Sequence, residues 1–259
     1  MNKKWEYYDV NEEEIKEISS KFNISKLLAK ILINREVIKY DEIKKFLNPT
    51  RNDFYDPFLL PDMEIAVDRI IKAIETKEKV IIYGDYDVDG ITSTTVLKQF
   101  LAERGLEVGY HIPNRLEEGY GLNKEAIENI VKEQYTLMIT VDCGISGIEE
   151  IELCNKLGID TIITDHHEQL EELPKALAIV DAKRKDNKYP FRGLAGCGVV
   201  FKLIQAISIK LELDDKEYLK YLDIVCVGTI SDIVPLVDEN RVIAKLRINV
   251  DCTNKKYRT

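Results

Sequence analysis

Three short apolar runs in this chain are each followed directly by acidic or imidazole side chains. These are Asp85, Asp87 and Asp89 after the first run, Asp142 after the second, and Asp165, His166 and His167 after the third. Carboxylates held close together repel one another unless a cation neutralises them. Carboxylate mixed with imidazole suits Mn²⁺, Mg²⁺ or Zn²⁺, and a set rich in carboxylate favours Mn²⁺ or Mg²⁺. Two such ions could hydrolyse a phosphodiester bond.

Each of these groups also has a simpler explanation. An Asp directly after a strand often caps the following helix, and His166–His167 could be a surface pair. The stretch from Asp85 to Gly90 could be a calcium loop, but Val96 stands at the twelfth position, where an EF-hand loop places Glu. Two of the only three histidines adjoin each other and an Asp. We therefore prefer the metal site.

The side chains depend on a regular alternation of elements for their placement. Short apolar runs predict strands at 80–83, 108–112, 137–141, 161–164 and 177–180, and helical spacing predicts helices at 63–76, 93–103, 123–133 and 147–157. This alternation is typical of an α/β fold with a doubly wound, mainly parallel sheet flanked by helices. In such folds ligands bind outside the carboxyl ends of the strands, where the acids fall.

The two ends of the chain differ from this pattern. Residues 1–62 predict a helical N-terminal segment, and 63–246 the α/β domain. After about 198 the pattern is mainly helical, with 224–230 readable as helix or strand. Residues 247–259 are polar and unpatterned, and we expect a divergent tail there.

Composition bounds the class of protein. The 259 residues carry 45% hydrophobic residues and a net charge of −9, which fits a globular protein. Two interpretations are compatible with that charge. The protein could have no nucleic-acid partner, or its acids could hold metal ions whose positive charge binds phosphate. The five cysteines form no CxxC pair, and no apolar run approaches the roughly 18 to 20 residues of a membrane span. We expect a cytoplasmic protein that does not contact the membrane.

Several motifs together give a specific resemblance. They are Tyr83–Ser93, Ile112–Leu122, Val141–Gly144, Thr164–Glu168 and Gly228–Leu236, with Phe46–Pro49 and Asp56–Met63 upstream. Asp165-His166-His167 is similar to the signature of the DHH phosphoesterase superfamily. Within it, residues 5 to 246 resemble the RecJ family of bacterial single-strand-specific exonucleases. The Gly-Asp-Tyr-Asp sequence from Gly84 favours that family over pyrophosphatases and short-oligonucleotide nucleases of the superfamily.

This resemblance implies roles for individual residues. The implied metal ligands, for two Mn²⁺ or Mg²⁺ ions, are Asp85, Asp87, Asp89, Asp142, Asp165, His166 and Asp232. In that family Asp142 would bridge the ions and Asp232 would close the second site. The residues expected to take part in catalysis are Asp87, Asp89, Asp142, His166 and His167.

Other residues are candidates for contact with substrate phosphate. Arg115 follows Pro-Asn, and His167 lies beside the ligands; for Arg115 an exposed surface position is the alternative. Gly196 and Gly198 precede a predicted helix and could present backbone N–H groups, although tight packing explains glycines equally well. The basic stretches 183–188 and 26–51 could follow a single strand, or could be solvated surface.

The resemblance also sets the expected activity. It implies a metal-dependent 5′ to 3′ exonuclease on single-stranded DNA that acts as a monomer in repair and recombination. Members of that family continue with a second substrate-binding domain and an OB-fold, so we expect a premature end or a frameshift near Leu246. The alternatives are a phosphodiesterase for short oligonucleotides or cyclic dinucleotides, and a non-catalytic nucleic-acid-binding fragment.

Overall fold

The computed structural model describes residues 9–114, 119 and 121–251, with backbone alone for 247–251. The chain divides into two compact units, one up to Asp53 and one from Phe54 onward. The first unit is helical, as predicted. It contains α1 (Glu12–Phe22), α2 (Lys26–Asn34), α3 (Tyr40–Leu47) and the 3-10 turn η1 (Arg51–Asp53). Its small core holds Ile15, Ile18, Ala29, Leu32 and Ile43.

The second unit is built on five parallel strands in the order β2-β1-β3-β4-β5. The strands are β1 (Lys79–Gly84), β2 (Glu107–His111), β3 (Leu137–Val141), β4 (Asp160–Thr164) and β5 (Ala178–Val180). The predicted doubly wound sheet is therefore confirmed. Because the chain passes from β1 to one side for β2 and to the other for β3, the winding reverses beside β1, where ligands bind in such folds.

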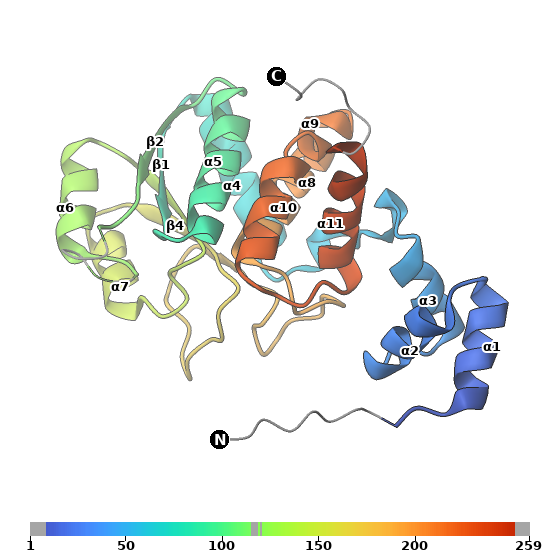
Figure 1. The fold of residues 1–259 in the computed structure, drawn as a ribbon. Helices are drawn as coiled ribbons and strands as arrows, with labels where there is room; N and C mark the ends of the chain where they lie inside the picture. Colours follow the sequence, from blue (N-terminus) through green and yellow to red (C-terminus); the bar gives the residue numbers. More distant parts are fainter. Residues whose placement is uncertain (1–8, 115–118, 120, 252–259) are drawn as a thin grey trace. The chain divides into compact units, whose positions relative to one another are not determined.

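Helices cover both faces of the sheet (Figure 1). On one face lie α6 (Lys124–Lys132) and α7 (Ile148–Lys156). On the other lie α4 (Met63–Thr76), α5 (Val88–Ala102) and α8 (Gly196–Lys210), with the short elements η2 (Pro57–Leu59) and α9 (Lys216–Leu219) nearby. Helix α10 (Leu222–Ser231) packs on α5 and α8, and α11 (Asp238–Asp251) packs on α10. Alternate residues of β1 enter the two cores: Ile82 packs with the α4–α5–α8 side and Ile81 with the α6–α7 side.

Two boundaries differ from the sequence prediction, and one stretch that it left open is assigned. Helix α5 begins at Val88 and not near Ser93, because the side chain of Asp87 accepts a hydrogen bond from the N–H of Gly90 and caps the helix. The second unit begins at Phe54, before the predicted domain start at Met63, because Leu60 belongs to its core. The ambiguous stretch 224–230 is helical, within α10.

A buried polar network ties the start of the second unit to its last helix. The ammonium of Lys202 lies 3.0 Å from a carboxylate oxygen of Glu239, and both side chains are buried. Glu239 also accepts hydrogen bonds from the backbone N–H of Tyr55, at 3.0 Å, and from the hydroxyl of Tyr189. The predicted tail beyond Leu246 begins as a continuation of α11 up to Asp251. No helix among the described residues is long and apolar enough to cross a bilayer.

Candidate metal centre

The carboxyl ends of β1, β3 and β4 bring their acids to one edge of the sheet. Asp85 follows β1, Asp142 follows β3, and Asp165 follows β4. The pairing register places Gly84 beside Val141 and Val141 beside Thr164, so the three strands end level with one another. Parallel pairing thus converts three separate sequence positions into one cluster.

His166 lies at the middle of the cluster. Its Nε2 is 3.0 Å from Oδ1 of Asp142 and 3.8 Å from Oδ2 of Asp89, and its Nδ1 is 3.8 Å from Oδ2 of Asp232. Asp89 comes from the first turn of α5 and Asp232 from the end of α10. One imidazole therefore faces carboxylates from three different elements.

The donor atoms fall into three groups, within each of which they lie no more than 4.8 Å apart. These groups are Asp142, His166 and His167; Asp89, His166 and Asp232; and Asp85, Asp87 and Asp142. Two buried atoms within them, Oδ1 of Asp85 and Nδ1 of His166, also lack a hydrogen-bond partner, and Oδ1 of Asp142 has Nε2 of His166 as its near polar neighbour at 3.0 Å. Buried polar atoms are normally satisfied, and carboxylate with imidazole is a donor set for divalent cations. The residues present therefore fit a metal centre.

The pKa of Asp142 also indicates that a cation binds in this cluster. Burial, followed by the nearby carboxylates of Asp89 and Asp87, raises the pKa of Asp142 to about 10. The pKa of Asp85 is also raised, mainly by burial, as is that of Asp232. The backbone at Asp142 has φ +60°, a left-handed conformation that Asp tolerates better than most residues. The fold thus gathers carboxylates that cannot all ionise without a cation.

Asp89 is fixed by the start of α8. Its carboxylate accepts hydrogen bonds from the N–H groups of Gly196 at 2.6 Å and Cys197 at 2.8 Å. A Cβ on Gly196 would lie 2.7 Å from Oδ1 of Asp142, so only glycine allows α8 to approach both acids this closely. The helix N-terminus therefore binds a carboxylate of the protein itself. This replaces the predicted contact between the N–H of Gly196 and a substrate phosphate.

Asp165 has a supporting role in this arrangement. One oxygen accepts the N–H of Ile145 at 2.9 Å, and the other accepts the N–H of His166 at 2.7 Å and lies 2.7 Å from Nδ1 of His167. Burial opposes ionisation of Asp165, but these hydrogen bonds and the His167 ring outweigh it and hold its pKa below the ordinary value. Asp165 is in none of the three donor groups, which differs from its predicted role as a metal ligand.

A family model named DHH family, N-terminal domain, matches residues 79–229, which include every strand and every residue of the three donor groups except Asp232. The chain belongs to the DHH family. This confirms the resemblance inferred from Asp165-His166-His167.

Comparison with individual proteins relates this DHH chain to RecJ. It is 43% identical to the single-stranded-DNA-specific exonuclease RecJ of Bacillus subtilis over 243 residues, 94% of this chain and 30% of that protein. The structure of Thermus thermophilus RecJ in complex with Mn²⁺ matches 90% of this chain and 32% of that one, at 28% identity and a TM-score of 0.74. The same protein with Mg²⁺ matches at 26% identity and a TM-score of 0.61, over 90% of this chain and 29% of that one. The chain spans about a third of the length of the curated relatives that it matches.

Most of the predicted residues of this DHH chain meet in the cluster. Asp85, Asp89, Asp142 and His166 are buried there, Asp87 is exposed and also caps α5, and Asp232 and His167 are partly exposed. Gly198 is buried in the first turn of α8, where a Cβ would contact Leu194 at 3.3 Å, and its contact with phosphate stays a prediction. Arg115 lies outside the described residues.

The structure adds one acid that the sequence argument passed over. Asp181 follows β5 directly and is fully buried, with Oδ1 accepting the N–H of Lys183 at 2.6 Å and Oδ2 without a partner. Burial, then proximity to Asp165, raises its pKa to about 7. The rule that identified the other acids, an Asp directly after a predicted strand, would have found it.

The basic stretch 183–188 is only partly available to a nucleic acid. Arg184 is buried, and its guanidinium pairs with Asp62 at 2.5 Å and Asp186 at 2.7 Å. Lys185 and Lys188 remain exposed. Arg184 therefore stabilises the loop after β5 and does not form part of a strand-binding surface.

Proposed function

We propose that this DHH chain carries the metal-dependent phosphodiesterase centre of a 5′ to 3′ exonuclease that acts on single-stranded DNA. The observation that carries the proposal is the set of three donor groups linked by Asp142 and His166, in which Oδ1 of Asp85 and Nδ1 of His166 are buried without a hydrogen-bond partner. Its similarity to RecJ, whose name in Bacillus subtilis describes a single-stranded-DNA-specific exonuclease, supports the choice of substrate.

The residues that would hold the ions follow from the donor groups. Asp142 and His166 each belong to two of the three groups, which supports two ions with shared ligands. Mn²⁺ and Mg²⁺ fit a set dominated by carboxylates, and RecJ of Thermus thermophilus is known with each of them. Bound there, divalent ions supply an activated water and neutralise the charge that develops on the phosphate.

The protein groups around the ligands supply orientation and charge. Asp89 is held by the N–H groups at the start of α8, and Asp165 orients the backbone and ring of the two histidines. The hydrogen bond to Asp165 raises the pKa of His167, which favours a cationic ring next to the ligands. A cationic imidazole there suits the binding of an anionic phosphate.

The proposal includes the biological setting. Single-stranded DNA is the partner, and we propose a monomeric, cytoplasmic protein that acts in DNA repair and recombination. The names of the similar bacterial RecJ proteins, single-stranded-DNA-specific exonucleases, support the DNA partner.

A direct assay tests the proposed activity. The purified chain is incubated with 5′-phosphorylated single-stranded DNA and Mn²⁺, and we expect release of mononucleotides that stops with EDTA and in Asp142→Asn. Duplex DNA and a dinucleotide serve as comparison substrates, and faster cleavage of the dinucleotide would favour the short-oligonucleotide alternative. Absence of release under conditions in which full-length Bacillus subtilis RecJ is active would contradict the proposal for this chain.

A further inference from the structure

A hollow of about 490 Å³ lies between α5 and the edge strand β2, and its lining includes none of the donor residues. This volume falls within the roughly 300 to 1,000 Å³ of small-ligand sites. The residues that carry the argument are Ile91, Thr95, Lys98, Gln99, Tyr110 and Ile112. In the part of the chain that the structure describes, β2 pairs only with β1, so its outer edge and this hollow are uncovered by any strand.

The hollow begins next to the metal centre. Ile91 is two residues beyond Asp89 in the first turns of α5, and it is 44% exposed. Ile112 follows the carboxyl end of β2, and the register pairs His111 with Tyr83 of β1, two residues before Asp85. The near end of the hollow therefore lies at the same sheet edge as the donor groups, and its far end follows α5 toward Ala102.

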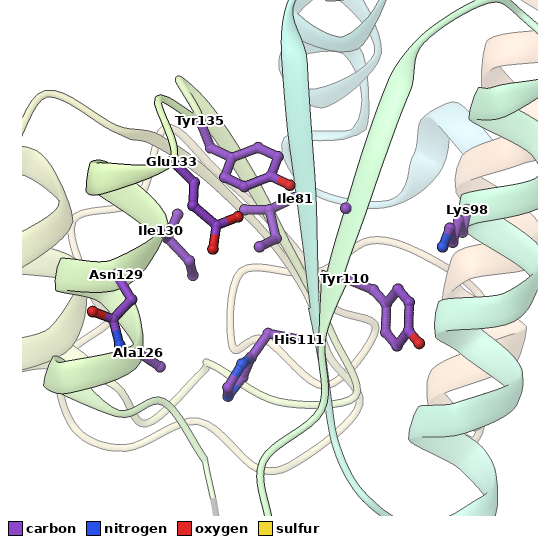
Figure 2. Close-up of a pocket in the computed structure, with 10 residues that line it drawn as sticks. Ile81, Lys98, Tyr110, His111, Ala126, Asn129, Ile130, Glu133 and Tyr135 are labelled. Carbon is purple, nitrogen blue, oxygen red and sulfur yellow. The ribbon is translucent and has the colours of Figure 1, made fainter.

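An aromatic ring and a cation meet inside the hollow. Tyr110 is 57% exposed, and Nζ of Lys98 lies 4.2 Å from the centroid of its ring. Figure 2 shows both side chains on the side of β2 that faces α5, whereas His111 lies on the side that faces α6. The contact with the ring keeps the ammonium at the hollow. An exposed tyrosine beside a lysine is a combination that binds a base and a phosphate together.

The remaining lining matches the same kind of ligand. Ile91 and Ile112 offer apolar surface for the face of a base, and Gln99, exposed one turn beyond Thr95, offers an amide to polar atoms of its edge. None of the lining residues is acidic, although the chain as a whole carries a net charge of −9. An anionic polymer therefore meets less repulsion here than on an average part of the surface.

We propose that this hollow is a binding subsite for one nucleotide of a single-stranded DNA whose reacting end lies at the metal centre. The base packs against Tyr110 and Ile112, and the adjoining phosphate meets Lys98. The inference rests on the proposed function, which it extends by assigning a path for the strand along α5. No chemical step occurs at this subsite.

Binding without cleavage tests the subsite. Fluorescence anisotropy of labelled oligothymidylate is measured with Ca²⁺ in place of Mn²⁺, for the wild-type chain and for Tyr110→Ala, Tyr110→Trp and Lys98→Ala. We expect Tyr110→Ala and Lys98→Ala to weaken binding about 5- to 30-fold, and Tyr110→Trp to preserve it. Lys132→Ala, an exposed lysine on α6, is the matched control and should leave binding unchanged.

Cross-linking locates the strand independently of affinity. Oligonucleotides with 5-iodouracil at successive positions are irradiated on the wild-type chain, and we expect an adduct on Tyr110 from a position near the 5′ end. Normal binding by Tyr110→Ala together with adducts elsewhere would overturn the subsite, even if the chain degrades DNA. A wild-type chain that binds no oligonucleotide would overturn the subsite and the proposed substrate together. A chain that binds through Tyr110 but never cleaves would support the subsite and contradict the nuclease function.

Discussion

Nδ1 of His167 lies 2.7 Å from Oδ1 of Asp165, and both residues belong to the triplet Asp165-His166-His167. The same carboxylate oxygen accepts the backbone N–H groups of His166 and His167. The first residue of the triplet therefore organises the other two, of which His166 belongs to two donor groups and His167 to one.

Loss of this contact should give a stability change confined to a pH window. The folded pKa of Asp165 is lowered, so its contribution exists above about pH 4 and is lost as pH falls through the folded value. The folded pKa of His167 is raised, so its contribution is complete below about pH 6.5 and is lost as pH rises through the folded value. For metal-free His167→Ala we expect the largest loss, about 1 kcal/mol because His167 is partly exposed, between about pH 4 and 6.5. Urea unfolding across pH measures it, and a loss that is equal at pH 5 and pH 9 would count against this pairing.

The close approach of α8 predicts a large difference between two glycine substitutions. In Gly196→Ala the added Cβ would lie 2.7 Å from Oδ1 of Asp142, so Asp142 must move. We expect this variant to lose about 1 to 3 kcal/mol of stability and to bind Mn²⁺ at least tenfold more weakly. Gly198→Ala, on the same helix and with a nearest contact of 3.3 Å, should keep Mn²⁺ affinity. Equal affinities in the two variants would show that Gly196 does not position the ligand.

The buried acid after β5 should destabilise the metal-free chain at high pH. Because the pKa of Asp181 is raised to about 7, its favourable contribution is present below about pH 4 and is lost as pH rises through about 7. Asp181→Asn keeps an oxygen for the N–H of Lys183 and removes the charge. We expect Asn to add on the order of 1 to 3 kcal/mol of stability at pH 9 and little at pH 4. Urea unfolding of both proteins at pH 4 and pH 9 tests the prediction. An Asp181→Asn variant that is less stable than the wild type at pH 9 would contradict it.

Removing one partner of the ion pair between Lys202 and Glu239 should reduce stability more than removing both charges does. Lys202→Met leaves Glu239 buried without its cation, for which we expect a loss of about 3 to 5 kcal/mol. The double variant Lys202→Met with Glu239→Gln removes both charges and should recover part of that loss. A double-mutant cycle by urea unfolding measures the coupling. Additive losses would mean that the two groups are not coupled in solution.

The features that depend on where the strands end could be predicted from the sequence. Acids directly after apolar runs could be assigned to one edge because parallel strands all end there, as Asp85, Asp142 and Asp165 do. The five strands were predicted within one or two residues at each end because buried parallel strands are short apolar runs. Asp232 required the family resemblance, since it follows a helix and not a strand.

Features that depend on packing between distant segments could not be predicted in this way. The glycines at the start of α8 suggested a phosphate site, whereas Gly196 donates to Asp89, which lies 107 residues earlier in the chain. Arg184 appeared to be part of a basic surface, but it is buried against Asp62. In both cases the partner is set by the tertiary fold, and local sequence carries no signal for it.

Calorimetric titration of the metal-free chain with Mn²⁺ tests the central claim most directly. Asp142 belongs to two donor groups and has a pKa raised to about 10, so ions that bind there must displace its proton. We predict binding of two ions per chain with release of protons, and loss of at least one ion in Asp142→Asn, a substitution that keeps the shape of the side chain. A wild-type chain that binds no Mn²⁺, or an Asp142→Asn variant that binds it as wild type does, would contradict the two-metal centre.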